Sequence, residues 1–271
     1  VVAVGTLHHS AHLAVLQRTD GGLKGLDMVV WQVVDKSDNA IVLHYVAPDG
    51  QDGFPGNRAI EMVYELTPNN EFLVSYNATT DAPTVMNLSH HSFFNLEGDG
   101  EGTILDHVLT IKSKAITPVN EYLIPTGELM CVKNTPFDFN EPCAIGERVN
   151  EEHEQLKMGA GYDHNWVLDK GEMIAGKKAK GKMNFAAELF CPLNGRFVKI
   201  YTTEPCIQMY SANWADYNQT AKGGEHLSFR CGVALETQHA PDSPNKPNWP
   251  TTIVKAGEKY SSTTEFRFGA K

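Results

Sequence analysis

Residues 59–79 of the chain read AIEMVYELTPNNEFLVSYNAT, and they give the clearest indication of the fold class. Two short runs rich in β-branched and aromatic residues flank a central Thr-Pro-Asn-Asn, and in the second run the apolar side chains occupy alternate positions. Alternation with a period of two is typical of a half-buried β-strand, and Pro-Asn-Asn is typical of a turn. The stretch therefore predicts two antiparallel strands, over 59–66 and 71–79.

The same pattern extends through the rest of the chain. Runs at 41–47 and 107–113 are short, rich in β-branched or aromatic residues and separated by turn residues such as those at 97–100. The one segment with helical character, 144–158, has few apolar anchors and is expected to be a short surface excursion. The sequence thus predicts an all-β fold, a large antiparallel β-sandwich, and with no repeat or linker it is read as a single domain over 1–271.

Composition excludes several classes of partner. The 271 residues carry 33 acidic and 23 basic side chains, a formal net charge of −10, which disfavours binding to nucleic acid. No apolar run approaches the roughly 20 residues of a membrane-spanning helix, so no membrane association is expected. The five cysteines are scattered and form no C-x-x-C pair, which favours a reducing, cytoplasmic location. A periplasmic or secreted location stays open for a chain whose leader has been removed.

Residues 87–96, NLSHHSFFNL, place two adjacent histidines, His90 and His91, where a strand is predicted to end. Successive side chains of a strand point to opposite faces, so one ring is expected to line a cleft and the other to meet the core or solvent. Polar groups are costly to bury without partners, so this density of Asn, Ser and His marks a candidate site. A structural role for either histidine stays open.

Two later segments have similar polar density. In residues 161–166, GYDHNW, Asp163 lies between Tyr162 and Trp166, which suits a sugar: rings stack on C–H surfaces while carboxylates and amides bind hydroxyls. A polar turn is the alternative. In residues 235–239, LETQH, Glu236 follows an apolar run. Burial at the end of a strand raises the pKa of a carboxylate and makes it a candidate general base. The alternative is a structural glutamate held by backbone donors.

Together these segments resemble the aldose 1-epimerase (galactose mutarotase) family. Three motifs carry most of the resemblance: N-L-x-x-H-S-[FY]-F-N-L at 87–96, G-[FY]-D-H-N at 161–165 and L-E-T-Q at 235–238. Further matching stretches, in the family's order, are 21–27, 52–57, 117–128 and 202–208. The resemblance covers the chain from about residue 21 onward, while 1–20 do not match and the family's N-terminal strands have no counterpart.

The resemblance implies a β-supersandwich and a mutarotase that interconverts the anomers of free hexoses by opening the sugar ring. In the family the motif histidine, here His91, is the general acid that protonates the ring oxygen. The motif glutamate, here Glu236, is the base that takes the proton from the C1 hydroxyl. Although 145 positions separate the two residues, their side chains are expected to face each other across a gap the width of one sugar ring.

Four further positions are candidates for binding the sugar. Asp163 and Gln208 match family positions that contact it. His90 stands where the family usually has Asn and is expected to be secondary. Asp20 replaces the His that precedes the Gly-Gly pair in the family.

The resemblance also implies a small-molecule partner, a hexose, with no metal and no organic cofactor, in a monomer or weak homodimer. Two alternatives stay open at this stage. One is a catalytically impaired sugar-binding protein on the same fold, suggested by the altered N-terminal segment. The other is a hexose-6-phosphate epimerase, which would need several arginines around a phosphate, and none adjoins Asp163 or Glu236 in sequence.

Overall fold

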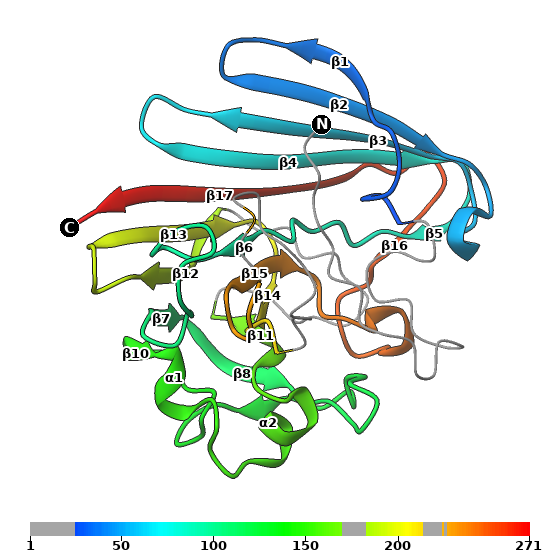
Figure 1. Cartoon of the computed structure of the whole chain (residues 1–271). Coiled ribbons are helices and arrows are strands. Elements are labelled where there is room, and N and C mark those ends of the chain that lie inside the picture. Colours follow the sequence, from blue (N-terminus) through cyan, green and yellow to red (C-terminus); the bar gives the residue numbers. More distant parts are fainter. Residues whose placement is uncertain (1–24, 170–182, 214–223, 225–226) are drawn as a thin grey trace.

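Two large antiparallel β-sheets face each other around a shared core in the computed structural model (Figure 1), which describes residues 25–169, 183–213, 224 and 227–271. This architecture confirms the predicted all-β sandwich. The predicted hairpin is present as β3 (Arg58–Leu66) and β4 (Glu71–Thr80), which pair antiparallel along their whole length.

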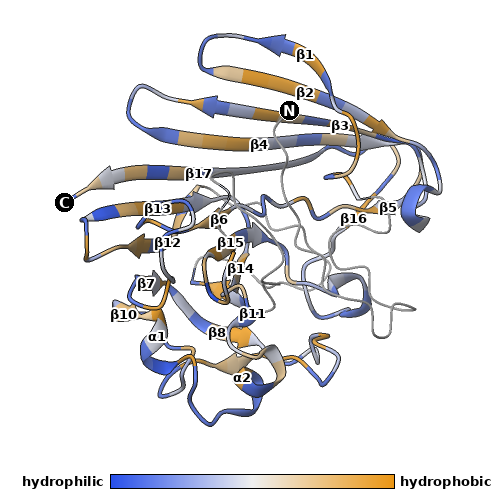
Figure 2. Cartoon of the chain, in the orientation of Figure 1, coloured by the Kyte–Doolittle hydropathy of each residue, from blue (hydrophilic) through white to orange (hydrophobic). Residues whose placement is uncertain are grey.

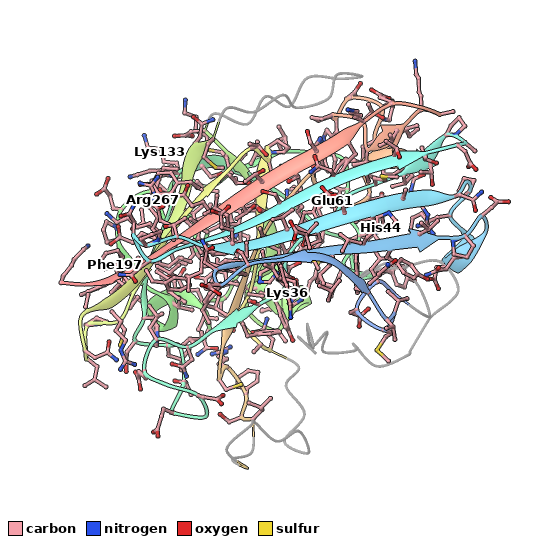
Figure 3. The ribbon with its side chains drawn as sticks, turned by 90° about the horizontal axis from the view of Figure 1, so that it is seen from above. Lys36, His44, Glu61, Lys133, Phe197 and Arg267 are labelled. Carbon is pink, nitrogen blue, oxygen red and sulfur yellow. The ribbon has the colours of Figure 1, made fainter. Side chains whose placement is uncertain are left out.

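The first sheet has nine strands. Their order across the sheet is β1 (Gln32–Lys36), β2 (Ala40–Ala47), β3, β4, β17 (Tyr260–Ala270), β13 (Arg196–Thr202), β12 (Asn184–Phe190), β7 (Val108–Ile111) and β10 (Cys143–Ala144). Its outer face is polar around His44 and Glu61, which are register partners on β2 and β3 (Figure 3).

The second sheet has six strands and carries the candidate site. Their order is β6 (Phe93–Phe94), β15 (Val233–Gln238), β14 (Cys206–Tyr210), β11 (Asp163–Leu168), β8 (Ser113–Thr117) and β9 (Met130–Cys131). A separate two-stranded sheet joins β5 (Thr84–Val85) to β16 (Ile253–Val254), and short 3-10 turns occupy Gln51–Gly53 and Ser243–Asn245.

The core lies between the two large sheets. Alternate residues of the long strands point into it, and hydrophobic and hydrophilic positions are interspersed along β2, β3 and β4 (Figure 2). The largest fully buried side chains are Trp166, Tyr162, Phe137, Phe139 and Phe266. Tyr162 and Trp166 on β11 pack against Phe137 and Phe139 from the segment between β9 and β10. Phe266 on β17 packs against Phe72 and Phe94. Burial of these rings stabilises the fold, because large apolar surfaces leave water.

The predicted strand over 107–113 is in fact two strands. β7 ends at Ile111 in the nine-stranded sheet, and β8 begins at Ser113 in the six-stranded sheet, so the chain changes sheets at Lys112. The side-chain amide of Asn140 donates to the Ser113 carbonyl, and the Ser113 hydroxyl donates to the carbonyl of Val167 on β11. These bonds hold the start of β8 in its new sheet, and the sequence pattern alone does not reveal them.

Helices are a minor feature of the described residues. The predicted excursion at 144–158 forms two short helices, α1 (Ile145–Arg148) and α2 (Glu154–Gly159). Within the described ranges, no helix is both long and apolar enough to span a bilayer.

Candidate active site

The segment that carries the two histidines is fixed between the sheets. The Ser89 hydroxyl donates to the Thr237 carbonyl on β15, while Tyr76 from β4 donates its phenolic O–H to the Ser89 carbonyl. The Asn87 side chain bonds both the N–H and the carbonyl of His239. The chain therefore enters β6 along the edge of β15 in a defined register.

His90 and His91 point to opposite faces, as predicted. His90 faces the core: its Nε2 lies 2.6 Å from the Ser92 hydroxyl, and its ring packs against Tyr64, Phe72 and Phe266. Burial lowers the pKa of His90 to about 4, helped by the neighbouring His91, so the ring is neutral near pH 7. With its ring held among core aromatics, His90 is not part of the sugar-facing group, contrary to the expectation of a secondary sugar contact.

His91 faces outward and meets Glu236. The register of β6 and β15, with Phe93 opposite Ala234, sets His91 level with Glu236 on the outer face of the six-stranded sheet. His91 Nε2 lies 3.2 Å from Glu236 Oε1, and the side chains are 17% exposed for His91 and 11% exposed for Glu236. The expected gap of one sugar ring is wrong: the two groups are in direct contact, because they project side by side from adjacent strands rather than from opposite walls.

Two aromatic rings flank the His91 imidazole. The ring of Phe93 lies 5.0 Å away between centroids, and that of Tyr210 lies 6.5 Å away in an edge-on arrangement. His91 Nδ1 is buried and has no hydrogen-bond partner in the part of the chain described. The ring is thus held by the contact of Nε2 with Glu236 on one side and by aromatic packing on the other.

Asp163 and Gln208 form a second polar pair on the same face. Gln208 Nε2 donates to Asp163 Oδ1 over 2.8 Å, and Gln208 is the register partner of Glu236 on the neighbouring strand. The structure therefore brings together four of the predicted residues: His91, Glu236, Gln208 and Asp163. Asp20 lies outside the described residues.

The aromatic neighbours of Asp163 cannot stack on a sugar, contrary to expectation. Tyr162 and Trp166 are fully buried on the core side, where the Tyr162 hydroxyl donates to the Pro136 carbonyl and Trp166 Nε1 to the Phe137 carbonyl. His164 faces the same way, and burial lowers its pKa to about 3. Its Nδ1 accepts the N–H of Asp163, so this core residue supports the backbone of a site residue.

The polar group lies between two small apolar clusters on the outer face. One consists of Phe93, Tyr210, Ala212 and Ala234. The other consists of Val167, Cys206, Ala240 and Trp249. Sequence reasoning missed Phe93 and Tyr210 as neighbours of His91, although Phe93 follows His91 by two positions and the period of a strand sets both on one face.

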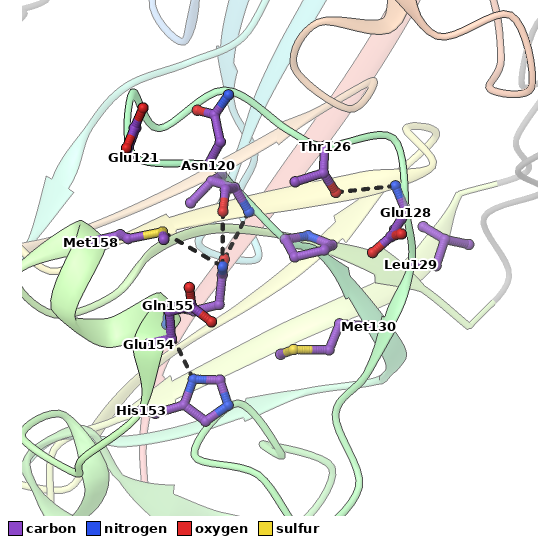
Figure 4. A pocket seen from close by; sticks show the side chains of 12 residues that line it. Asn120, Glu121, Thr126, Glu128, Leu129, Met130, His153, Glu154, Gln155 and Met158 are labelled. Carbon is purple, nitrogen blue, oxygen red and sulfur yellow. Dashed lines mark hydrogen bonds between the residues drawn. The ribbon is translucent and has the colours of Figure 1, made fainter.

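The cavity of about 620 Å³ shown in Figure 4 is a different feature. It lies beside β9 and α2 and is lined by Asn120, Glu128, Met130, His153 and Met158 among others, and none of the predicted site residues lines it. Among the residues that the structure describes, no group of three or more His, Cys, Asp or Glu side chains is placed to bind a metal ion.

A carboxylate in contact with an imidazole, beside a carboxylate–amide pair on one face of a β-sandwich, provides groups suited to acid–base chemistry on a ligand rich in hydroxyls. The chain belongs to the aldose 1-epimerase family, whose model matches residues 16–267. It is 38% identical over 248 residues to galactose mutarotase of Bos taurus, an alignment that covers 92% of this chain and 68% of the relative. It is also 36% identical over 254 residues to aldose 1-epimerase of Escherichia coli K12, covering 93% and 70%.

Solved structures agree on the fold. The galactose 1-epimerase of Lactobacillus acidophilus NCFM superposes with a TM-score of 0.76 at 25% identity, covering 91% of this chain and 68% of that one. The GalM/aldose epimerase homologue of Caenorhabditis elegans gives 0.78 at 24% identity, covering 92% and 71%. The chain is therefore an isomerase, an aldose 1-epimerase with a sugar as substrate. Neither alternative, a non-catalytic sugar-binding protein or a hexose-6-phosphate epimerase, is favoured.

Proposed function

We propose that Glu236 is the general base and His91 the general acid in the interconversion of the α and β anomers of free hexoses such as galactose and glucose. The observation that carries this proposal is the 3.2 Å contact between His91 Nε2 and Glu236 Oε1. O1 and O5 of a pyranose are both bonded to C1, so a base and an acid side by side on adjacent strands reach both oxygens of one sugar.

The reaction follows from this placement. Glu236 takes the proton of the O1 hydroxyl, the C1–O5 bond breaks, and its electron pair moves to O5, which takes the Nε2 proton of His91. Rotation about C1–C2 turns the other face of the aldehyde toward O5. The reverse transfers then close the ring as the other anomer and return each proton to its donor, so no covalent intermediate forms.

Asp163 and Gln208 are proposed to bind the sugar hydroxyls. Because Gln208 donates to Asp163 Oδ1, the carboxylate is already oriented before a ligand arrives, and its second oxygen is directed by the same bond. Orientation of this kind reduces the entropy lost on binding. We also propose that the protein acts in the cytoplasm, as a monomer or weak homodimer; the five free thiols support the reducing location.

Polarimetry tests the proposal. Freshly dissolved α-glucose or α-galactose is followed to equilibrium with wild type, with Glu236→Gln and with Glu61→Gln, a matched carboxylate-to-amide change on the outer face of the other sheet. Loss of the base is expected to lower kcat by about 10²–10⁴-fold, while Glu61→Gln keeps the wild-type rate. Near-full activity of a folded Glu236→Gln variant would exclude Glu236 as the base.

A further inference from the structure

A line of polar side chains crosses the outer face of the six-stranded sheet and continues beyond the proposed site. Register pairs run from Glu236 on β15 to Gln208 on β14, then to Asn165 on β11 and Thr117 on β8. Directly opposed residues of an antiparallel pair share a face, with Cβ atoms about 4.5–5.5 Å apart. The four side chains therefore form one continuous row, of which only the first half belongs to the proposed acid–base and sugar-binding group.

The far half of this row is buried without ordinary hydrogen bonds. Asn165 is 1% exposed and Thr117 is fully buried. Asn165 Oδ1 and Nδ2, Thr117 Oγ1 and Gln208 Oε1 have no hydrogen-bond partner in the described part of the chain. The Asn165 amide lies beside the thiol of Cys206, and that contact lowers the thiol pKa against the larger raising effect of burial. A thiol is only a weak hydrogen-bonding group, so it does not satisfy the amide.

These four buried polar atoms belong to three neighbouring side chains of the row. Each buried polar atom without a partner costs about 1–3 kcal/mol. Folded proteins satisfy such atoms with internal water, which makes about three hydrogen bonds to polar groups around it. Gln208 Oε1, the Asn165 amide and the Thr117 hydroxyl come from three adjacent strands and supply both donors and acceptors, so they provide what one internal water needs.

Resting on the proposed function, we propose that Asn165 is a positioning residue: with Thr117 it binds an internal water that holds Gln208 Oε1. The Gln208 amide has two ends, and the bond to Asp163 Oδ1 fixes only Nε2. Fixing Oε1 from the Asn165 side prevents rotation of the amide, so Gln208 keeps donating to Asp163. Asn165 thus orients the sugar-binding pair without touching the sugar.

Variants that keep shape but remove polarity test this role. Asn165→Leu and Thr117→Val remove the groups that hold the water, and Thr117→Ser keeps the hydroxyl. The matched control is Thr84→Val, because Thr84 on β5 also has a buried hydroxyl without a described partner but lies in the separate two-stranded sheet. Each variant is measured for the dissociation constant of galactose by calorimetry, for KM and kcat by polarimetry, and for melting temperature.

Asn165→Leu is expected to raise the dissociation constant and KM roughly five- to tenfold, the loss of about one hydrogen bond, with kcat within twofold of wild type. Thr117→Val is expected to raise both by a smaller factor, while Thr117→Ser and Thr84→Val leave them unchanged. A purely structural role predicts a lower melting temperature with unchanged sugar affinity, and that result overturns the proposal.

The outcomes separate this inference from the proposed function. If Asn165→Leu does not fold, the comparison of Thr117→Val with Thr117→Ser decides, and equal affinities overturn the inference. If wild type gives no mutarotation, only the proposed function is rejected. The galactose affinities of the variants still test the positioning role in that case. An active wild type, an inactive Glu236→Gln and an Asn165→Leu variant with wild-type affinity would reject only the positioning role.

Discussion

Three buried histidines are expected to make the fold sensitive to mild acid. His90, His107 and His164 are all at least nine-tenths buried, and desolvation lowers their pKa to about 4, 4 and 3. In the unfolded chain the same side chains titrate near pH 6.5. Below that pH the unfolded state binds more protons than the native state, so the free energy of unfolding falls as the pH is lowered.

The size of the effect follows from these values. Between pH 7 and pH 5 each unfolded histidine becomes almost fully protonated while its native counterpart stays mostly neutral, a loss of about 1.8 kcal/mol per residue and about 5.5 kcal/mol in all. Domains are stable by only about 5–15 kcal/mol, so the loss is large. For a chain of this size it corresponds to a fall in melting temperature of roughly 10–20 °C. Carboxylates with a lowered pKa, such as Glu188, lose their contribution to the free energy of unfolding only at lower pH, so they have little effect between pH 7 and pH 5.

Calorimetric melting at half-unit steps from pH 7.5 to pH 4.5 measures this dependence. In His107→Gln, an amide oxygen can replace Nε2 as acceptor of the Leu96 N–H but does not titrate, so the fall between pH 7 and pH 5 is expected to shrink by about a third. Leu109→Ala is the control, since a cavity in the core lowers the melting temperature at every pH without changing its pH dependence. A wild-type melting temperature that stays flat from pH 7 to pH 5 would refute the reasoning.

Three further substitutions probe the site. His91→Ala is expected to lower kcat by about two orders of magnitude with little change in melting temperature, and wild-type kcat in polarimetry would remove His91 as the acid. Asp163→Asn is expected mainly to raise KM, because the amide lacks the charge that strengthens bonds to sugar hydroxyls; an unchanged KM would remove Asp163 from the binding group. Gly161→Ala is expected to lower the melting temperature and raise KM, because φ is +140° and an added Cβ would lie 2.8 Å from Asn213 Cγ; native-like melting would contradict this.

The features that the sequence predicted correctly depend on local patterns. Alternation over 59–79 predicted β3 and β4, and the same period predicted that His90 and His91 face opposite ways. The features that could not be predicted from the sequence depend on pairing between strands that are distant in the chain. The transfer between sheets at Lys112 is set by Asn140 and by Val167, and no local pattern carries that information.

The geometry of the acid–base pair shows the same limit. Motif positions indicated that His91 and Glu236 act together, but only the register of β6 and β15 reveals that they project from one surface and touch. Likewise, the sequence alone does not indicate which of the residues after Asp163 faces the core and which faces outward. The strand period assigns Asn165 to the outer row and Trp166 to the core, once the register partner of each is known.

Because core and site alternate along the same strands, stability and sugar binding are physically coupled in this protein. His164 is the clearest case: its imidazole lies in the core, yet its Nδ1 accepts the backbone N–H of Asp163. Because burial lowers the pKa of His164 to about 3, Nδ1 stays an acceptor through the pH range in which acid lowers the free energy of unfolding, so the bond to Asp163 persists as long as the core is folded. His90 couples the two in a second way, since its core packing fixes the backbone from which His91 reaches Glu236. Substitutions at inward-facing positions of β11 and of the segment leading into β6 should therefore change KM or kcat without contacting the sugar.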